Sequence, residues 1–211
     1  MKNTLPLPGK TGLHIAFTGI DGAGKTTQAG KLAFHIKQKY GPTYLAEPRT
    51  DLVSQMLHVL AWKHGQTSRR EYFGDHIVDF SKAFDVVRDY YSTVAPLLAS
   101  GMHVVEPRSI FCRIAMAFAM NGARDKKTEQ VLSVIPKPNL LFWVDTNPSV
   151  ALARIQRRGI DTEKLEDLRR FSRAYHKMPE SADWVQIQGD KAQKTLEKEI
   201  RRHVDDLFAK Q

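Results

Sequence analysis

Short apolar runs alternate with longer stretches of helical spacing along this chain. Residues 13–18 read LHIAFT, a run suited to a buried strand, and residues 26–40 carry apolar side chains at helical spacing until Gly41 and Pro42 end the pattern. This order predicts a strand, a loop and a helix. Further strands are predicted at 43–46, 102–105, 140–144 and 184–187, and further helices at 51–62, 68–99, 110–120, 149–158, 164–175 and 192–209.

The alternation of strands with helices predicts an α/β fold. Strands in this order pair in parallel through right-handed crossovers, so helices cover both faces of one sheet. The run LLFWV at 140–144 is apolar throughout, as in a strand that is covered on both faces. Within 68–99, Gly74 and Pro96 are the expected interruptions. The chain has 211 residues and shows neither an internal repeat nor a low-complexity linker, so we expect one domain, 1–211.

Composition and charge narrow the class of protein. A net charge of +9 indicates polyanionic partners, but the basic residues are spread along the chain, so nucleic-acid binding is not expected as the primary role. No apolar stretch is long enough to span a membrane, and MKNTLPLPGKTG at the start lacks the apolar core of a signal peptide. We therefore expect a cytoplasmic protein. Cys112 is the only cysteine, which excludes an intrachain disulfide and a cysteine metal cluster.

A glycine-rich loop follows the first predicted strand. The segment GIDGAGKT, residues 19–26, matches G-x-x-x-x-G-K-[ST] between a strand and a helix, where backbone N–H groups and the helix N-terminus bind phosphate. Lys25 is expected to reach the β and γ phosphates of ATP, and the Thr26 hydroxyl is expected to bind Mg²⁺. The residues expected to bind ATP are Gly19, Ile20, Asp21, Gly22, Ala23, Gly24, Lys25, Thr26 and Thr27.

Asp21 is the unusual position inside this loop. A carboxylate that pointed into the loop would repel the phosphates, so we expect Asp21 to point towards the acceptor of the phosphoryl group. There it would accept a hydrogen bond from a sugar hydroxyl. The alternative is an exposed loop acid with no role in binding, and the sequence leaves both interpretations open.

The chain resembles the thymidylate kinase family. Its TGIDGAGKTTQ segment is similar to the P-loop of that family, and further similar segments follow in the family's order. They are Glu47-Pro48, Phe84 with Arg88, VVEPR at 104–108, ALARIQRRG at 151–159 and a final strand–helix unit. The resemblance implies a P-loop NTPase fold with three α/β/α layers, a five-stranded parallel sheet and a short lid at about 154–175.

The resemblance also implies which residues bind the acceptor nucleotide. Phe84 and Arg88 share one helix face. The ring offers a stacking surface for a base, and the guanidinium offers donors for a base carbonyl or a phosphate. The alternative is a structural role, because aromatic residues at helical spacing more often lie in the core. Arg108 follows a strand and is expected to hold the acceptor phosphate. The expected acceptor-binding residues are Asp21, Glu47, Arg49, Phe84, Arg88, Arg108 and Tyr175.

The sequence departs from the family at two acceptor-side positions. Pro107 stands where the family has an aspartate before the arginine, and Ala46 stands where the family has an arginine before Glu-Pro, with Arg49 as the nearest substitute. These two changes weaken the case for thymidylate as the acceptor more than the case for kinase chemistry.

Arginines at the end of the 149–158 helix resemble the start of the family's lid. Phosphoryl transfer through a loose transition state depends on positioning and on neutralising charge, so such arginines are expected to stabilise the transferring group. We expect one of Arg157 and Arg158 to face the phosphates, with Arg154 one turn earlier as a second. The expected catalytic residues are Lys25, Arg108, Arg154 and Arg158. A solvated basic helix end is the alternative.

Taken with the resemblance, the sequence predicts a nucleoside monophosphate kinase that uses ATP and Mg²⁺ and acts on a pyrimidine deoxynucleotide, dTMP before others. Two alternatives stay open. A kinase of a modified nucleotide or a deoxynucleoside would need a carboxylate base, from Asp21, Glu47 or Glu106, if the acceptor were a hydroxyl. A nucleotide-binding module without catalysis would also retain the loop. Family members often form dimers, so a homodimer is a further expectation of the resemblance.

Overall fold

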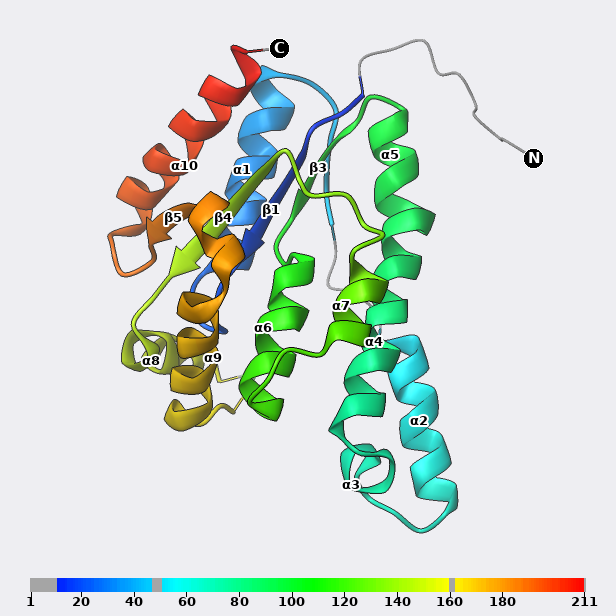
Figure 1. Ribbon diagram of the computed structural model, residues 1–211. Coiled ribbons are helices and arrows are strands. Elements are labelled where there is room, and N and C mark those ends of the chain that lie inside the picture. Colours follow the sequence, from blue (N-terminus) through cyan, green and yellow to red (C-terminus); the bar gives the residue numbers. More distant parts are fainter. Residues whose placement is uncertain (1–10, 47–50, 160–161, 211) are drawn as a thin grey trace, which may run out of the picture.

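A parallel sheet forms the centre of the molecule (Figure 1). The structure, a computed structural model, describes residues 11–46, 51–159 and 162–210. Five strands follow the order β2-β3-β1-β4-β5, and every pairing is parallel. The strands are β1 (His14–Thr18), β2 (Thr43–Leu45), β3 (His103–Glu106), β4 (Leu140–Asp145) and β5 (Val185–Gln188). The predicted five-stranded parallel sheet is confirmed.

Strand β1 lies at the middle of this sheet. Ile15 of β1 is level with Val105 of β3 on one side and with Leu140 of β4 on the other, and all five residues of β1 are buried. A strand that is covered on both faces can be apolar throughout, which explains the run in the sequence. The loop that leaves β1 therefore starts from a strand that is buried along its whole length.

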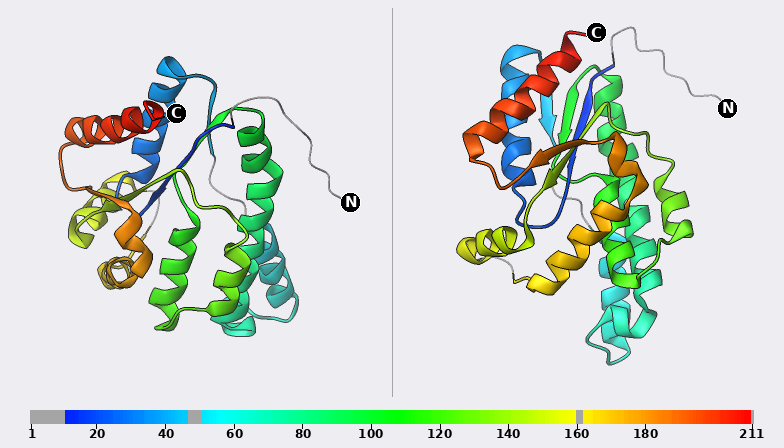
Figure 2. Two further views of the ribbon diagram at one scale, coloured as in Figure 1. Left: turned by 45° about the horizontal axis from the view of Figure 1, so that its top comes forward. Right: turned by 60° about the vertical axis from the view of Figure 1, so that its left-hand side comes forward.

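Helices cover both faces of the sheet, which gives the predicted three layers. Figure 2 shows α1 and α10 on one side, with α5, α6 and α9 on the other. Lys31 of α1 pairs with Glu197 of α10 at 2.8 Å, and the rings of Tyr40 and Phe208 stack at 3.8 Å. The α-helices are α1 (Lys25–Lys39), α2 (Leu52–Lys63), α3 (Arg69–Phe73), α4 (Asp75–Asp89), α5 (Ala95–Ala99), α6 (Ile110–Asn121), α7 (Lys126–Leu132), α8 (Pro148–Arg158), α9 (Leu165–Lys177) and α10 (Gln193–Phe208).

The helix predicted at 68–99 is interrupted at one of its two expected places. Gly74, with φ of 81°, separates α3 from α4 as expected. Pro96 causes no break, because a π-helical turn, η1 (Tyr90–Val94), joins α4 to α5. The N–H of Ala95 bonds the carbonyl of Tyr90, five residues earlier, and Pro96 then sits in the first turn of α5, where no N–H is needed.

Two short elements of the structure were not predicted. Helix α7 begins after Asp125, whose side chain accepts a hydrogen bond from the N–H of Lys127, and a 3₁₀ helix, η2 (Pro179–Asp183), precedes β5. Helices α2, α3 and α4 extend past the carboxyl edge of the sheet, on the same side as the loop after β1 (Figure 1). Among the described helices, none has the length and apolar character needed to cross a bilayer.

Candidate functional site

The loop between β1 and α1 requires glycine at particular positions. A Cβ atom on Gly19 would lie 2.5 Å from the Val144 carbonyl oxygen, and one on Gly22 would lie 2.3 Å from the Ala151 carbonyl oxygen. Gly24 has φ of 96° and caps the start of α1. These contacts close the loop tightly against β4 and α8, with the N-terminus of α1 at its end.

An open cavity of about 1010 Å³ lies in front of the loop. Its wall consists of residues 21–28, Arg108, Arg154, Ile155, Arg157, Arg158, Thr162, Glu163, Gly189, Lys191, Gln193 and Leu196. Cationic side chains predominate among the charged ones, so the cavity suits a polyanion. Arg157 and Arg158 both line it, together with Arg154, whose Nη2 donates to the Gly189 carbonyl at 2.9 Å.

Lys25 is buried at the floor of this cavity. Its Nζ donates to the carbonyl oxygens of Gly19 and Ile20 at 2.8 and 2.7 Å and lies 3.6 Å from Asp21 Oδ1. Burial, followed by the nearby Arg108 guanidinium, lowers the pKa of Lys25. The backbone of the loop thus holds the ammonium group at the floor of the cavity.

Asp21 joins Lys25 to Arg108. Arg108 Nη2 donates to Asp21 Oδ1 at 2.5 Å, so the carboxylate lies between a cation of the loop and a cation from the end of β3. Burial alone would raise the pKa of Asp21, but Lys25 and Arg108 outweigh it and lower the pKa. Asp21 is therefore an ionised acceptor of hydrogen bonds that faces Arg108.

Tyr175 holds the start of the loop from the other side. Its hydroxyl donates to the Gly19 carbonyl at 3.2 Å and accepts from Thr18 Oγ1 at 3.2 Å. The Thr18 hydroxyl also lies 3.3 Å from the Sγ of Cys112. Tyr175 and Cys112 border a second, small hollow of about 20 Å³ that also touches Asp21 and Arg108. Burial raises the pKa of Tyr175 well above its usual value, so the phenol stays protonated and able to donate.

Phe84 and Arg88, which were expected to bind the acceptor, do not line the cavity. Phe84 is 48% exposed and its ring contacts Phe80, while Arg88 Nη2 donates to Asp89 at 2.7 Å. Neither borders the cavity in front of the loop or the small hollow beside Tyr175, and their acceptor role stays a prediction. Glu47 and Arg49 lie outside the described residues.

Several residues of the cavity wall were not found from the sequence. Gly189 and Lys191 follow β5, so the rule that ligands bind beyond the carboxyl ends of strands would have identified them. Behind the loop, Thr18 contacts Cys112 and Tyr175, which lie 94 and 157 positions further along the sequence, and no local pattern indicates such contacts.

The hydroxyl of Thr26 could serve as an oxygen ligand for a divalent cation. It is exposed on the cavity wall, beside the loop. Across the described part of the chain, no group of three or more His, Cys, Asp or Glu residues could hold a metal ion. A Mg²⁺ ion here would need most of its oxygen ligands from a bound nucleotide and from water, as is usual for this ion.

Replacement of Tyr175 by Phe tests the support of the loop. The variant loses the hydrogen bond to Gly19, so we expect ATP to bind about fivefold more weakly, equivalent to about 1 kcal/mol. Tyr91→Phe is the matched control, because the Tyr91 hydroxyl donates to the Val134 carbonyl at 2.7 Å, on an exposed surface that borders neither hollow. Isothermal titration with ATP is the measurement, and equal affinities for both variants would contradict this role.

Comparison with known proteins identifies the family. A family model described as thymidylate kinase matches residues 17–200. The chain is 29% identical to a probable thymidylate kinase of Archaeoglobus fulgidus, over 92% of this chain and 95% of that protein. It is 31% identical to a probable thymidylate kinase of Pyrobaculum calidifontis (77% and 80%) and 26% identical to the thymidylate kinase of Dictyostelium discoideum (95% and 88%). The chain therefore belongs to the thymidylate kinase family, whose members are nucleoside monophosphate kinases.

Proposed function

We propose that this protein transfers the γ-phosphoryl group of ATP to the 5′-phosphate of a pyrimidine deoxynucleoside monophosphate, with dTMP as the preferred acceptor. The observation that carries the proposal is the bridge from Lys25 through Asp21 to Arg108. It connects the phosphate-binding loop with an arginine at the end of β3. A donor phosphate and an acceptor phosphate would meet at this bridge.

ATP, the phosphoryl donor, would bind at the loop after β1. The N–H groups at the start of α1 point to the cavity, where they and Lys25 would hold the β and γ phosphates of ATP. Arg154, Arg157 and Arg158 line the same cavity and would neutralise charge on the transferring group. Thr26 would hold Mg²⁺, which neutralises phosphate charge when it is bound.

The acceptor side rests on Arg108 and Asp21. The Arg108 guanidinium would bind the acceptor phosphate with two donors, and Asp21 would orient the acceptor through a sugar hydroxyl. An acceptor phosphate is already ionised at neutral pH, so no general base is needed. Asp21 is a poor base because its pKa is lowered, and Glu106 is buried against His14 Nε2 at 2.8 Å. These contacts support a phosphate over a hydroxyl as the acceptor.

We also propose that the protein is cytoplasmic and that a short lid closes over the bound ATP. A cytoplasmic protein would share the compartment in which nucleotides are made and would not face an oxidising environment with its single thiol, Cys112. A short lid at about 154–175 would bring the arginines of α8 over the donor, and 1–211 would act as one domain.

An ADP-release assay tests the proposed reaction. With Mg²⁺ and ATP, we expect strong turnover with dTMP and weak turnover with other monophosphates and with free nucleosides. Lys25→Ala and Arg108→Ala should each lower kcat by about 10²- to 10³-fold, because each removes one cation from the reacting phosphates. Arg202→Ala, an exposed position on α10, is the control and should leave turnover unchanged.

Each alternative predicts a different result in this assay. Turnover only with another monophosphate or with a nucleoside would favour the kinase of a modified nucleotide or a deoxynucleoside. Tight ATP binding without turnover would favour a non-catalytic module, and a steep salt dependence of DNA or RNA binding would support it further, given the net charge of +9.

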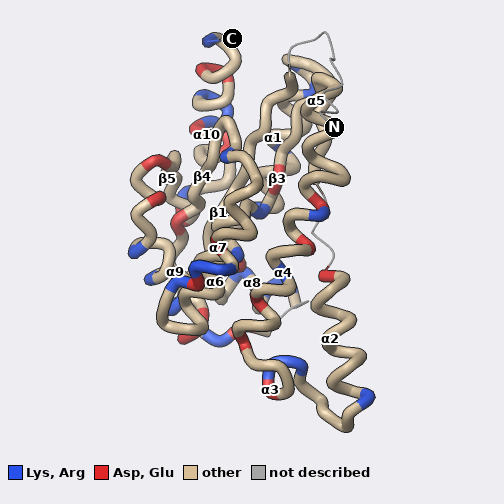
Figure 3. The backbone as a smooth tube through the Cα atoms, turned by 45° about the vertical axis from the view of Figure 1, so that its right-hand side comes forward, with Lys and Arg blue, Asp and Glu red and all other residues tan. Residues whose placement is uncertain are grey.

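We also propose that the protein forms a homodimer through α2. One face of this helix exposes Leu52, Val53, Met56, Val59 and Leu60, each between 36% and 59% exposed. No charged residue lies between Asp51 and Lys63, as Figure 3 shows along the helix. An apolar helix face of this length is complementary to a copy of itself across a two-fold axis, which is the usual symmetry of small oligomers.

Light scattering with size-exclusion chromatography tests this dimer. Met56→Glu should halve the measured mass, because an unpaired carboxylate inside an apolar interface costs several kcal/mol. His58→Glu places the same charge on the opposite side of α2 and should leave the dimer intact. A wild-type protein that elutes with the mass of one chain would contradict the proposal.

A further inference from the structure

A chain of buried hydrogen bonds runs behind the phosphate-binding loop and joins three elements of the fold. Thr18 is the last residue of β1, and its Oγ1 lies 3.3 Å from the Sγ of Cys112 on α6 and 3.2 Å from the Tyr175 hydroxyl on α9. The three side chains are between 0% and 7% exposed. Helices α6 and α9 pack against each other on one face of the sheet (Figure 2). The Thr18 hydroxyl is thus a point at which β1, α6 and α9 meet.

The number of available protons fixes the direction of this chain. The Gly19 carbonyl can only accept, so the Tyr175 hydroxyl donates its one proton there, at 3.2 Å, and accepts from Thr18. Because the one proton of the Thr18 hydroxyl points to Tyr175, the Cys112 thiol donates to Thr18 Oγ1. Hydrogen bonds that all run in one direction polarise and strengthen one another. The chain therefore runs from Cys112 through Thr18 and Tyr175 to the Gly19 carbonyl.

The chain ends at the carbonyl that also holds Lys25. Lys25 Nζ donates to the Gly19 carbonyl at 2.8 Å and to the Ile20 carbonyl at 2.7 Å. A carbonyl oxygen has two lone pairs, so the Gly19 oxygen accepts from Tyr175 and Lys25 together. The place of this carbonyl therefore decides where the ammonium group lies, and Tyr175 fixes the carbonyl from behind the loop.

The chain begins on the helix that follows Arg108. The N–H of Ser109, the next residue, donates to the Phe17 carbonyl of β1 at 2.9 Å, and Ser109 Oγ accepts from the N–H of Phe111 in the first turn of α6. Cys112 lies in the same turn. Asp21 contacts both cations in front of the loop, and the chain behind the loop links the same two segments a second time.

We propose that Thr18 is a positioning residue for phosphoryl transfer, whose hydroxyl keeps Lys25 in register with Arg108. The inference rests on the proposed function, because it takes these two cations to act on the donor and acceptor phosphates. Thr18 is 0% exposed and does not line the cavity, so it acts through Tyr175 and the Gly19 carbonyl. Transfer depends on the alignment of the reacting atoms, and a misplacement of about 1 Å costs about 100-fold in rate. Loss of the hydroxyl should therefore lower the rate of transfer more than the binding of either substrate.

Thr18→Val and Thr18→Ser separate the hydroxyl from the shape of the side chain. Valine gives Tyr175 no donor and puts a methyl group 3.2 Å from the phenol oxygen, whereas such contacts need about 3.5–4.0 Å, so Tyr175 is pushed off the Gly19 carbonyl. With Mg²⁺, ATP and the acceptor that the wild-type protein turns over, kcat should fall about 10-fold or more, and the KM of each substrate should stay within about threefold. Thr18→Ser keeps the hydroxyl and should restore most of kcat.

Thr128→Val is the matched control. Thr128 is 2% exposed, its hydroxyl donates to Asp125 Oδ2 at 2.5 Å, and it lines neither the cavity nor the small hollow beside Tyr175. Both valine variants lose one buried threonine hydrogen bond, so each should lower the Tm by about 2–4 °C. Only Thr18→Val should lower kcat.

Three results would overturn the inference. They are an unchanged kcat in Thr18→Val, a loss that appears in KM instead of kcat, and a Thr18→Ser variant as impaired as Thr18→Val. An equal fall of kcat in Thr128→Val would overturn it as well, because kcat would then report stability alone. A wild-type protein without turnover contradicts the proposed function and this inference together, whereas an active wild-type protein with an unaffected Thr18→Val variant contradicts this inference alone.

Discussion

One carboxylate, Asp21, holds together the two cations on which the site depends. Lys25 lies at the start of α1 and Arg108 follows the end of β3, and both side chains contact the same oxygen, Asp21 Oδ1, at 3.6 and 2.5 Å. Two cations this close to one atom would repel each other by about 3 kcal/mol at an effective dielectric constant of about 20. Asp21 offsets that repulsion, and the two cations, Lys25 before Arg108, outweigh the effect of burial, lower the pKa of Asp21 and keep it ionised. The positive charge of Lys25 and Arg108 is thus balanced in part by an acid within the loop itself.

The order of the strands makes this contact possible. In a sheet with the order β2-β3-β1-β4-β5, β3 lies directly beside β1, so the segments that follow both strands emerge at the same edge. Gly19 and Gly22 allow the loop to approach β4 and α8 closely, and Tyr175 holds the Gly19 carbonyl from α9. The loop, the end of β3 and Tyr175 of α9 therefore all lie against β1, whose five residues are all buried.

Local patterns in the sequence were sufficient for the fold and for the phosphate-binding loop. The five strands, the main helices and GIDGAGKT all follow from apolar spacing and from one contiguous motif. The π turn at Tyr90–Val94 was missed because the usual effect of Pro96 is to end a helix, and here one additional residue in the turn accommodates it.

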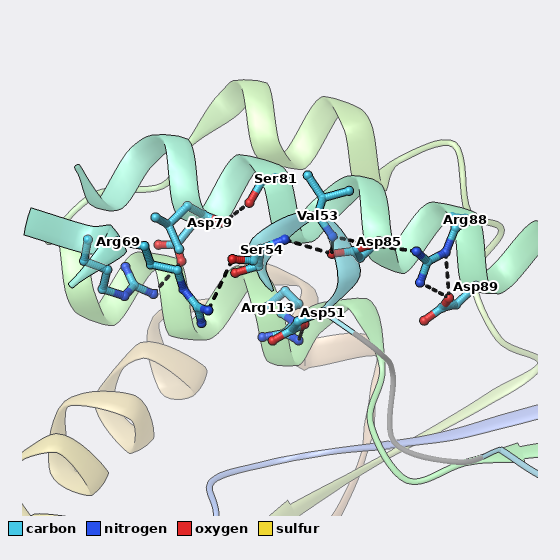
Figure 4. Close-up of polar contacts among 12 residues, drawn as sticks. Asp51, Val53, Ser54, Arg69, Asp79, Ser81, Asp85, Arg88, Asp89 and Arg113 are labelled. Atoms are coloured by element: carbon cyan, nitrogen blue, oxygen red, sulfur yellow. Dashed lines mark hydrogen bonds and ion pairs between the residues drawn. The ribbon is translucent and has the colours of Figure 1, made fainter. Parts of the chain in front are cut away.

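Contacts between distant segments could not be predicted. Tyr175 was expected near the acceptor, but its bonds to Thr18 and Gly19 depend on the packing of α9 against β1. In the same way, Val53 and Asp85 are 32 positions apart, and the N–H of Val53 donates to the Asp85 carboxylate only because α2 packs against α4 (Figure 4). Such pairs leave no periodic signal in a single sequence.

A double-mutant cycle on Asp21 and Arg108 tests the central claim most directly. The kcat/KM for dTMP would be measured for the wild-type protein, Asp21→Asn, Arg108→Met and the double variant. If the carboxylate acts by holding the arginine, the two effects are not additive, and the double variant loses at least about 1 kcal/mol less than the sum of the single losses. Additive losses would show that Asp21 and Arg108 act independently and would contradict the account.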